Sequence, residues 1–451
     1  MTHATIPPML HHRRAARSGR PLHRLATTLA VFILVVAACG TSAPSASPGS
    51  VAPSASPLAS PVPSPSASTA ATPVVDAASL YKTIEDQVVA IRGLQPKAAV
   101  SPTVLDDAGI KKLINDSFRK DNPPELMAAN ERILKALGLM PADASLTDLY
   151  ISLLSSQVAG LYSPDDKKLY VVSKSGGLGA TEKVTFSHEF THALQDQNFD
   201  IGSLRLDEIG QGDRSFARLS LVEGDATLVM SQWEIQNLTQ AELGEILSAA
   251  GDDESLKILL AMPAILRESL LFPYTMGLGF VQGMQGQGGW DAVNKAFAQP
   301  PDSTEQILHP DKYFAREAPV PVAFPKALAS SLGAGWKVGL EDSFGEFQMQ
   351  IWLKQNTTVP AATAIDAAAG WGGDRIAALN GPNGAWAVAF KTVWDTNADA
   401  AAFETVATPI VEKLSDPAGL VPGAGGRERW VLVASDQDVL QTLAATLGLA
   451  S

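Results

Sequence analysis

Two histidines with a glutamate beside the first carry the clearest chemical signal in this 451-residue sequence. His188 and His192 are four residues apart, so on a helix both imidazoles lie on one face and can share one metal ion. Glu189 lies roughly 100° further around the helix axis, beside the open coordination position of that metal. Beyond the N-terminal region the chain has only one other histidine, His309. The pattern therefore predicts a zinc site rather than a chance match on a surface helix.

A catalytic zinc site needs a third protein ligand, and Glu223 is the best candidate. It lies within an apolar run, Leu219 to Val229, of a predicted helix over residues 216–236. A carboxylate there is costly to bury unless it is paired or bound to a metal. Two histidines and one glutamate form a known zinc ligand set, which lowers the pKa of a bound water to about 7. A salt bridge is the other interpretation of Glu223, and His309 is the alternative third ligand.

The run His188-Glu-Phe-Thr-His192-Ala-Leu-Gln-Asp196, followed by Glu223, resembles the gluzincins, the thermolysin-like zinc metallopeptidases. The resemblance covers about 45 residues. It implies a zincin-like fold, a Zn²⁺ cofactor and hydrolysis of peptide bonds in a peptide or protein substrate. It also implies that Glu189 is the general base, which takes a proton from water and passes it to the leaving amine.

In gluzincins, acidic side chains and a nearby strand support the metal ligands and the substrate. The resemblance implies that Asp196, four residues after the second histidine, holds a ligand from behind, and Asp225 is a second candidate for that role. It also implies an edge strand that binds peptide by strand addition. We expect residues 169–173 to provide it.

Further side chains are candidates for stabilising the oxyanion of a tetrahedral intermediate. They are His309, Tyr274 and Tyr313. A wider stretch, residues 80–410, resembles a group of uncharacterised bacterial lipoproteins and secreted proteins, which implies no substrate. Its motifs include Phe272-Pro-Tyr274, Gly289-Trp290 and Gly370-Trp-Gly-Gly-Asp-Arg375. We interpret the two Gly-Trp motifs as turns with packed indoles.

The N-terminus has the pattern of a lipoprotein signal peptide over residues 1–38. An Arg- and His-rich segment precedes an uncharged apolar run over residues 25–38. The sequence Val36-Ala37-Ala38-Cys39 resembles a bacterial lipobox, which implies a lipid on Cys39. The alternative, a membrane-spanning helix, needs about 20 apolar residues. We therefore expect a protein anchored to the outer face of the bacterial cell membrane.

The segment that follows, residues 39–74, is predicted to be a tether. From residue 41 it contains eight prolines and no charge, a composition that does not fold and favours extended conformations. The whole chain has a formal net charge of -13, which argues against a nucleic-acid partner because phosphates need a basic face.

The remaining chain predicts an α+β fold that is mostly helical, with two domains. A zincin-like catalytic domain is expected at 75–320, and a separate, smaller α+β domain at 321–451. The main predicted helices are 78–91, 108–120, 124–137, 146–158, 181–197, 216–236, 239–249, 253–268, 274–286, 289–298, 341–354, 398–414 and 437–447. A hairpin is predicted at 160–172, and strands at 386–394 and 429–434.

These patterns together predict zinc-dependent peptide-bond hydrolysis at the cell surface. The alternative is a non-catalytic, metal-containing surface lipoprotein that acts as a binding module. Glu189 favours the enzyme, since a structural zinc needs no general base and is usually closed by four ligands. A peptidase held latent by its own C-terminal domain is the third interpretation.

Overall fold

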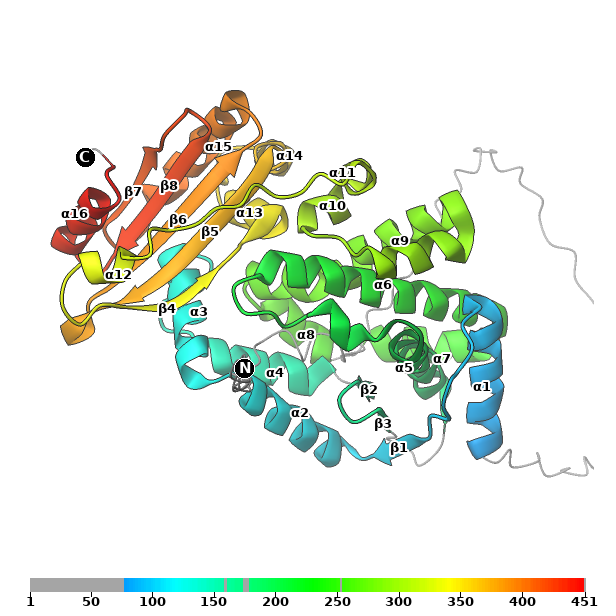
Figure 1. Cartoon of the computed structure of the whole chain (residues 1–451). Helices are drawn as coiled ribbons and strands as arrows, with labels where there is room; N and C mark the ends of the chain where they lie inside the picture. The colour runs from blue at the N-terminus through cyan, green and yellow to red at the C-terminus, as the bar shows by residue number, and fades with distance from the viewer. Residues whose placement is uncertain (1–76, 158–159, 173–177, 252–253, 450–451) are drawn as a thin grey trace, which may run out of the picture.

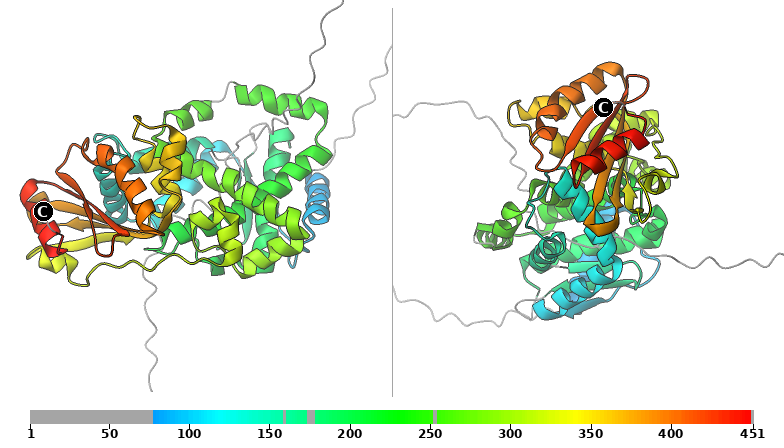
Figure 2. Two further views of the ribbon diagram at one scale, coloured as in Figure 1. Left: turned by 90° about the horizontal axis from the view of Figure 1, so that it is seen from above. Right: turned by 90° about the vertical axis from the view of Figure 1, so that its left-hand side faces the viewer.

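The computed structural model describes residues 77–157, 160–172, 178–251 and 254–449. The predicted signal peptide, Cys39 and the tether lie outside the described residues. The fold is α+β and mostly helical, with a helical body and a five-stranded sheet at one end of the molecule (Figures 1 and 2).

The first part of the helical body includes a small sheet. Its elements are α1 (Ala77–Arg92), β1 (Pro102–Leu105), α2 (Asp107–Asp121), α3 (Pro124–Ala136), α4 (Leu146–Gln157), β2 (Gly160–Ser163) and β3 (Lys168–Val172). Strand β1 was not predicted, because four residues offer too little periodicity.

In this sheet the strand order is β1-β3-β2, with β1 parallel and β2 antiparallel to β3. Strand β1 pairs with residues 169–172 of β3 and strand β2 with residues 168–171, so both edges of β3 are paired over residues 169–171. The prediction that residues 169–173 form a peptide-binding edge strand is wrong for the described part, residues 169–172, because β3 is central and cannot accept another strand. The edges are β1 and β2.

Two helices, α5 (Ala180–Phe199) and α6 (Gly212–Asn237), occupy the centre of the helical body (Figure 1). Every residue of α5 from 184 to 196 is buried. The helix is therefore enclosed on all sides rather than amphipathic, and its polar residues need partners inside the protein. A short 3-10 turn, η2 (Ile201–Leu204), follows α5.

Three further helices complete this body: α7 (Gln240–Gly251), α8 (Glu254–Ala261) and α9 (Ala264–Ala298). The predicted breaks in this region are partly wrong. The predicted helix 253–268 is interrupted at Pro263, the residue just before α9. Proline is tolerated there because the first N–H groups of a helix have no intrahelical partner, so none is lost. Pro273 lies inside α9, and only Gly288 and Gly289 leave helical geometry there.

Helices α6 and α9 cross in direct backbone contact. A Cβ atom on Gly224 would lie 2.2 Å from the carbonyl oxygen of Gly277, and one on Gly277 would lie 2.2 Å from that of Ser220. Only glycine at both positions allows this approach. The crossing lies directly after Glu223, so it fixes α9 beside the candidate ligand.

The C-terminal sheet has five antiparallel strands in the order β4-β5-β6-β8-β7. They are β4 (Lys337–Asp342), β5 (Trp371–Asn380), β6 (Trp386–Trp394), β7 (Ala418–Pro422) and β8 (Glu428–Ala434). Alternate residues face opposite sides: Ile376 and Ala378 join the main core, whereas Ala377 and Leu379 join a second cluster. Both faces of the sheet are therefore covered.

Short helices accompany these strands. They are α10 (Thr304–Leu308), α11 (Pro310–Ala315), α12 (Leu328–Ser331), α13 (Gly345–Leu353), α14 (Ala361–Asp366), α15 (Asn397–Val411) and α16 (Gln437–Thr446), with the 3-10 turn η3 (Pro382–Gly384). The predicted strands at 386–394 and 429–434 and the helices at 398–414 and 437–447 are confirmed within a few residues.

Two predictions in this region are wrong. The predicted helix 341–354 begins only at residue 345, because residues 337–342 form β4. The Trp371-Gly-Gly motif belongs to β5 rather than to a turn, although its indole is buried as expected. A Cβ on Gly373 would lie 2.4 Å from the Val320 carbonyl oxygen, so glycine at this position allows the two backbone segments to approach closely.

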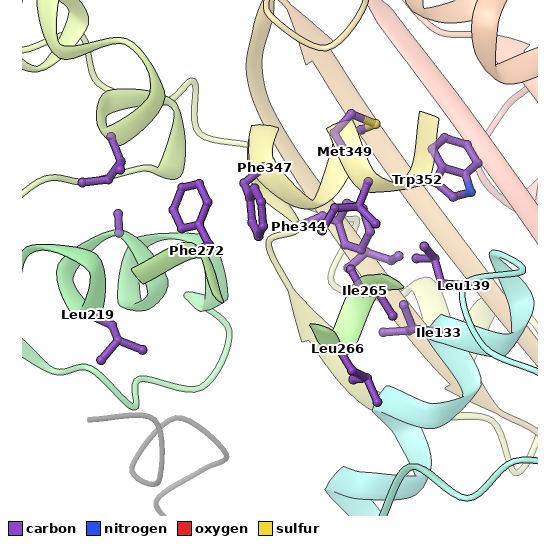
Figure 3. Close-up of a cluster of buried hydrophobic side chains, with 14 of the residues drawn as sticks. Ile133, Leu139, Leu219, Ile265, Leu266, Phe272, Phe344, Phe347, Met349 and Trp352 are labelled. Carbon is purple, nitrogen blue, oxygen red and sulfur yellow. The ribbon is translucent and has the colours of Figure 1, made fainter. Parts of the chain in front are cut away.

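The two parts of the molecule share one hydrophobic core, so the predicted C-terminal domain packs directly against the helical body. Phe272 of α9 faces Phe347 of α13 with ring centroids 3.9 Å apart (Figure 3). Trp352 of α13 is fully buried, and its Nε1 donates to the Leu137 carbonyl at 3.0 Å. Ile133 and Leu139 also enter this cluster (Figure 3).

Candidate metal centre

The structure brings the two histidines and Glu223 together between α5 and α6. The Nε2 atoms of His188 and His192 are 3.0 Å apart, and each lies 3.3 Å from Glu223 Oε2. A tetrahedral zinc ion with bonds of 2.0–2.2 Å holds its ligand atoms roughly 3.3–3.5 Å apart. The two distances to Glu223 match one face of such a tetrahedron, and the two histidine nitrogens lie about 0.3 Å closer together than that face requires.

The chemistry of these donors also fits a cation. Glu223 is fully buried, and among the described residues its Oε1 has no hydrogen-bond partner. An ionised carboxylate in that position needs a positive partner. Within the described residues, His188, His192 and Glu223 form a buried cluster whose ligand atoms lie close enough together to hold one metal ion.

Without a metal, a proton on His192 supplies positive charge beside Glu223. Burial lowers the pKa of His188 below its ordinary value. Burial would do the same to His192, but the charge of Glu223 outweighs it and raises the pKa of His192 to about 9. Burial acts to raise the pKa of Glu223, but the two histidines keep it below its usual value. A metal would have to displace the proton of His192.

Glu189 lies beside this triangle and is held by the small sheet. Its Oε2 accepts a hydrogen bond from the backbone N–H of Tyr162, in β2, at 2.7 Å. Strand β2 passes close to α5 because Gly160 has no side chain: a Cβ there would lie 2.5 Å from Thr185 Cγ2 and 3.2 Å from Glu189 Cγ. The edge strand β2, not β3, therefore positions the candidate base.

Asp196 is buried near the site but does not hold a histidine. Its Oδ2 accepts from Tyr162 Oη at 2.7 Å and from Lys167 Nζ at 2.6 Å. The role implied for it by the resemblance is therefore wrong. These two partners belong to β2 and the following turn, so the carboxylate anchors the strand that carries the Tyr162 amide.

The group behind His192 is Gln195, which the sequence analysis missed. Gln195 Oε1 lies 2.8 Å from His192 Nδ1, and its Nε2 donates to Asp225 Oδ2 at 2.9 Å. Asp225 thus acts through Gln195 rather than on a histidine directly. The i, i+3 spacing of His192 and Gln195 could have indicated this contact, but a glutamine is not the acid that the family resemblance implies.

Tyr274 is the candidate oxyanion donor that lies beside the ligands. Its ring centroid is 6.2 Å from that of His188. Tyr274 also lines a mainly apolar cavity of about 190 Å³, which reaches Leu219, one helical turn before Glu223. The C-terminal part contributes Leu340, Phe344 and Ile376 to the cavity wall.

His309 and Tyr313 have structural partners elsewhere. His309 Nε2 lies 3.0 Å from Glu346 Oε1, in α13, and this contact raises the pKa of the imidazole. Tyr313 Oη donates to the Gln299 carbonyl at 2.9 Å. The structure therefore brings Glu223, and not His309, to the two histidines.

A second cluster of three acidic side chains surrounds a lysine. Glu305, Glu317 and Asp395 surround Lys312 Nζ at 2.6, 2.9 and 2.9 Å. The ammonium group satisfies these carboxylates, so they form an ion-pair network that joins α11 to the C-terminal sheet.

In a comparison with known protein families, only the C-terminal part of the chain matches a family. Residues 337–442 match a family described as a domain of unknown function (DUF8575). The match begins at β4 and ends within α16, so it covers the five-stranded sheet. No curated protein and no solved structure matches the chain. Among the described helices, none is both long and apolar enough to cross a membrane.

Proposed function

We propose that this chain is a zinc-dependent peptidase with a zincin-like helical body. The observation that carries the proposal is the triangle of His188 Nε2, His192 Nε2 and Glu223 Oε2, with Glu189 on the same helix beside it. The three ligand types are those of the gluzincins.

A zinc ion on these ligands would supply a Lewis acid and lower the pKa of water in its open position to about 7. Glu189 then receives a proton from the attacking water on its carboxylate and delivers it to the leaving nitrogen. The Tyr162 amide restricts the orientation of Glu189 and leaves its charge in place. Tyr274, beside His188, donates to the developing oxyanion in this proposal.

The apolar cavity beside Tyr274 supports a substrate with a large apolar side chain. A cavity of about 150 Å³ lined by apolar residues binds benzene, and this one has about 190 Å³. Its apolar wall includes residues from both parts of the molecule, which gives the C-terminal sheet a role in substrate binding.

One observation favours the non-catalytic alternative. His188, Glu189, His192 and Glu223 are each at most 1% exposed. A peptide must reach the metal, so an enzyme needs this site to open. A binding module or a latent peptidase does not.

Glu189→Gln separates these functions. Glutamine keeps the size of the side chain and an oxygen that accepts from Tyr162, but it is not a base. We expect the variant to bind zinc as the wild type does, while peptide turnover falls by about 10²–10⁴-fold. Zinc content by elemental analysis and hydrolysis of a peptide library should be measured on the same preparation. Equal turnover in wild type and variant, with zinc retained, would eliminate the proposed mechanism.

We further propose that a lipid on Cys39 anchors the protein to the outer face of the cell membrane. Metabolic labelling with a fatty acid should mark the wild type, and Cys39→Ser should be unlabelled and either unprocessed or released. Unlabelled wild type that still sediments with membranes would instead indicate an uncleaved anchor helix.

A further inference from the structure

We propose that Gln195, Asp225 and Arg92 form a positioning chain that orients His192 and thereby couples helix α1 to metal affinity. The inference rests on the proposed metal site and concerns how that site is regulated. It uses side chains that never contact the metal.

The first link fixes which nitrogen of His192 is free for the metal. Gln195 Nε2 donates to two groups that only accept, the Val222 carbonyl and Asp225 Oδ2, both at 2.9 Å. These partners fix the amide orientation, so Oε1 is the atom that faces His192 Nδ1 at 2.8 Å. Because an amide oxygen can only accept, Nδ1 carries a hydrogen, so Nε2, which faces the ligand triangle, is the nitrogen whose lone pair is offered to a metal.

The second link is a buried ion pair. Asp225 Oδ1 accepts from Arg92 Nε at 2.7 Å, and both side chains are fully buried. The Arg92 guanidinium lies 4.5 Å from the Trp290 ring centroid and 5.9 Å from that of Phe199. Within the described residues its Nη1 and Nη2 have no hydrogen-bond partner. Asp225 and the two aromatic faces therefore hold the charge in place.

The two histidines differ in this respect. His188 Nδ1 is buried and has no hydrogen-bond partner among the described residues. His192 alone is oriented from behind, so the geometry of the triangle depends on this chain of contacts. Partners of this kind raise ligand basicity, and their loss typically lowers metal affinity by about 10–100-fold.

The chain of contacts ends on α1, since Arg92 is the last residue of that helix. Linkage is reciprocal: if docked α1 strengthens metal binding, bound metal must equally stabilise the docking of α1. In this proposal, any change that undocks α1 weakens the metal site. The region predicted to tether the protein directly precedes α1, so a force on the tether would act on this helix.

The test compares zinc affinity in full-length mature variants by competition with a chelating indicator. Gln195→Met removes the links to His192 and Asp225 without leaving a buried charge alone, and we expect about 10–100-fold weaker binding. Arg92→Met should weaken binding similarly, and Arg92→Lys should restore part of it. Should Arg92→Met fail to fold, Arg92→Met with Asp225→Asn removes both charges and should still bind more weakly than wild type.

Gln197→Met is the matched control. It makes the same substitution two residues later on α5, where Gln197 binds the backbone of Lys97 and Ala98 rather than a histidine. It should leave zinc affinity within about twofold, below the range expected for lost ligand support. Hydrogen exchange should also show that zinc protects α1 in the wild type and less so in Gln195→Met.

Two outcomes overturn different statements. A wild type that binds no zinc would remove the metal site itself. Zinc bound by the wild type, lost in His192→Ala and unchanged in folded Gln195→Met would overturn the positioning chain while leaving the proposed peptidase intact.

Discussion

At the scale of single residues, the site depends on which side chains share the interior between α5 and α6. Glu223 and His309 were both candidates for the third ligand. Glu223 lies 3.3 Å from each histidine, whereas His309 contacts Glu346. Glutamate and histidine are both common zinc ligands, so the sequence alone did not decide between these two residues.

Glu223→Ala should therefore abolish stoichiometric zinc binding, because two imidazoles alone leave the ion without its anionic ligand. His309→Ala should keep zinc and instead lower the free energy of unfolding by about 1–3 kcal/mol, since it leaves the buried Glu346 short of a partner. Elemental analysis and denaturant unfolding of both variants provide the measurements. The reversed result would make His309 the ligand.

At the scale of elements, the helix crossing between α6 and α9 sets the shape of the site. Gly224 and Gly277 allow the two backbones to touch directly after Glu223. The same crossing holds Tyr274, one turn before Gly277, beside His188. The edge strand β2 acts in a similar way on the other side, where Gly160 lets the Tyr162 amide reach Glu189.

Gly224→Ala and Gly277→Ala should each destabilise the protein by about 1–3 kcal/mol or more, because the added Cβ would lie 2.2 Å from a backbone oxygen. Alanine's helix propensity offsets at most about 1 kcal/mol of this. Gly279→Ala, on the same helix, meets nothing within 4 Å and should be neutral or stabilising. Thermal unfolding and zinc content test the pair, and equal stability of all three variants would contradict the crossing.

At the scale of the whole molecule, α6 joins the helical body to the C-terminal sheet. The Gly212 amide donates to Asp342 at 2.6 Å, and Arg375 Nη1 donates to the Gly210 carbonyl at 2.5 Å. Asp213 accepts from the Thr304 amide and hydroxyl at 3.1 and 2.5 Å. Together with the shared core around Phe347, these contacts form a continuous interface between the two parts.

The pH dependence of stability should report this junction. Burial raises the pKa of Asp213 from 3.8 to about 8. Between those values the folded state keeps a proton that the unfolded chain releases. The free energy of unfolding should therefore fall as pH rises, by up to about 1.4 kcal/mol per pH unit.

Denaturant unfolding at pH 5, 6.5 and 8 should show a weaker pH dependence in Asp213→Asn than in the wild type. The exposed Asp438→Asn controls for the loss of one acidic residue. Parallel curves for wild type and Asp213→Asn would mean that Asp213 is ionised across this range.

Local pattern was sufficient for much of this protein. The i, i+4 spacing of His188 and His192 places both on one helical face wherever the helix lies. An acid in an apolar run, Glu223, needs a partner in any fold that buries it. The strongly periodic helices and the strands at 386–394 and 429–434 were likewise predictable, because their signals come from neighbouring residues.

Only the tertiary structure decided which distant groups meet. Asp196 has the sequence position of a supporting acid but faces Tyr162 and Lys167, and Gln195 stands behind His192 instead. The family resemblance implied that residues 169–173 form an edge strand, yet β1 pairs with β3 from nearly 70 residues earlier in the chain. Such pairings depend on packing between segments far apart in sequence, for which local periodicity carries no information.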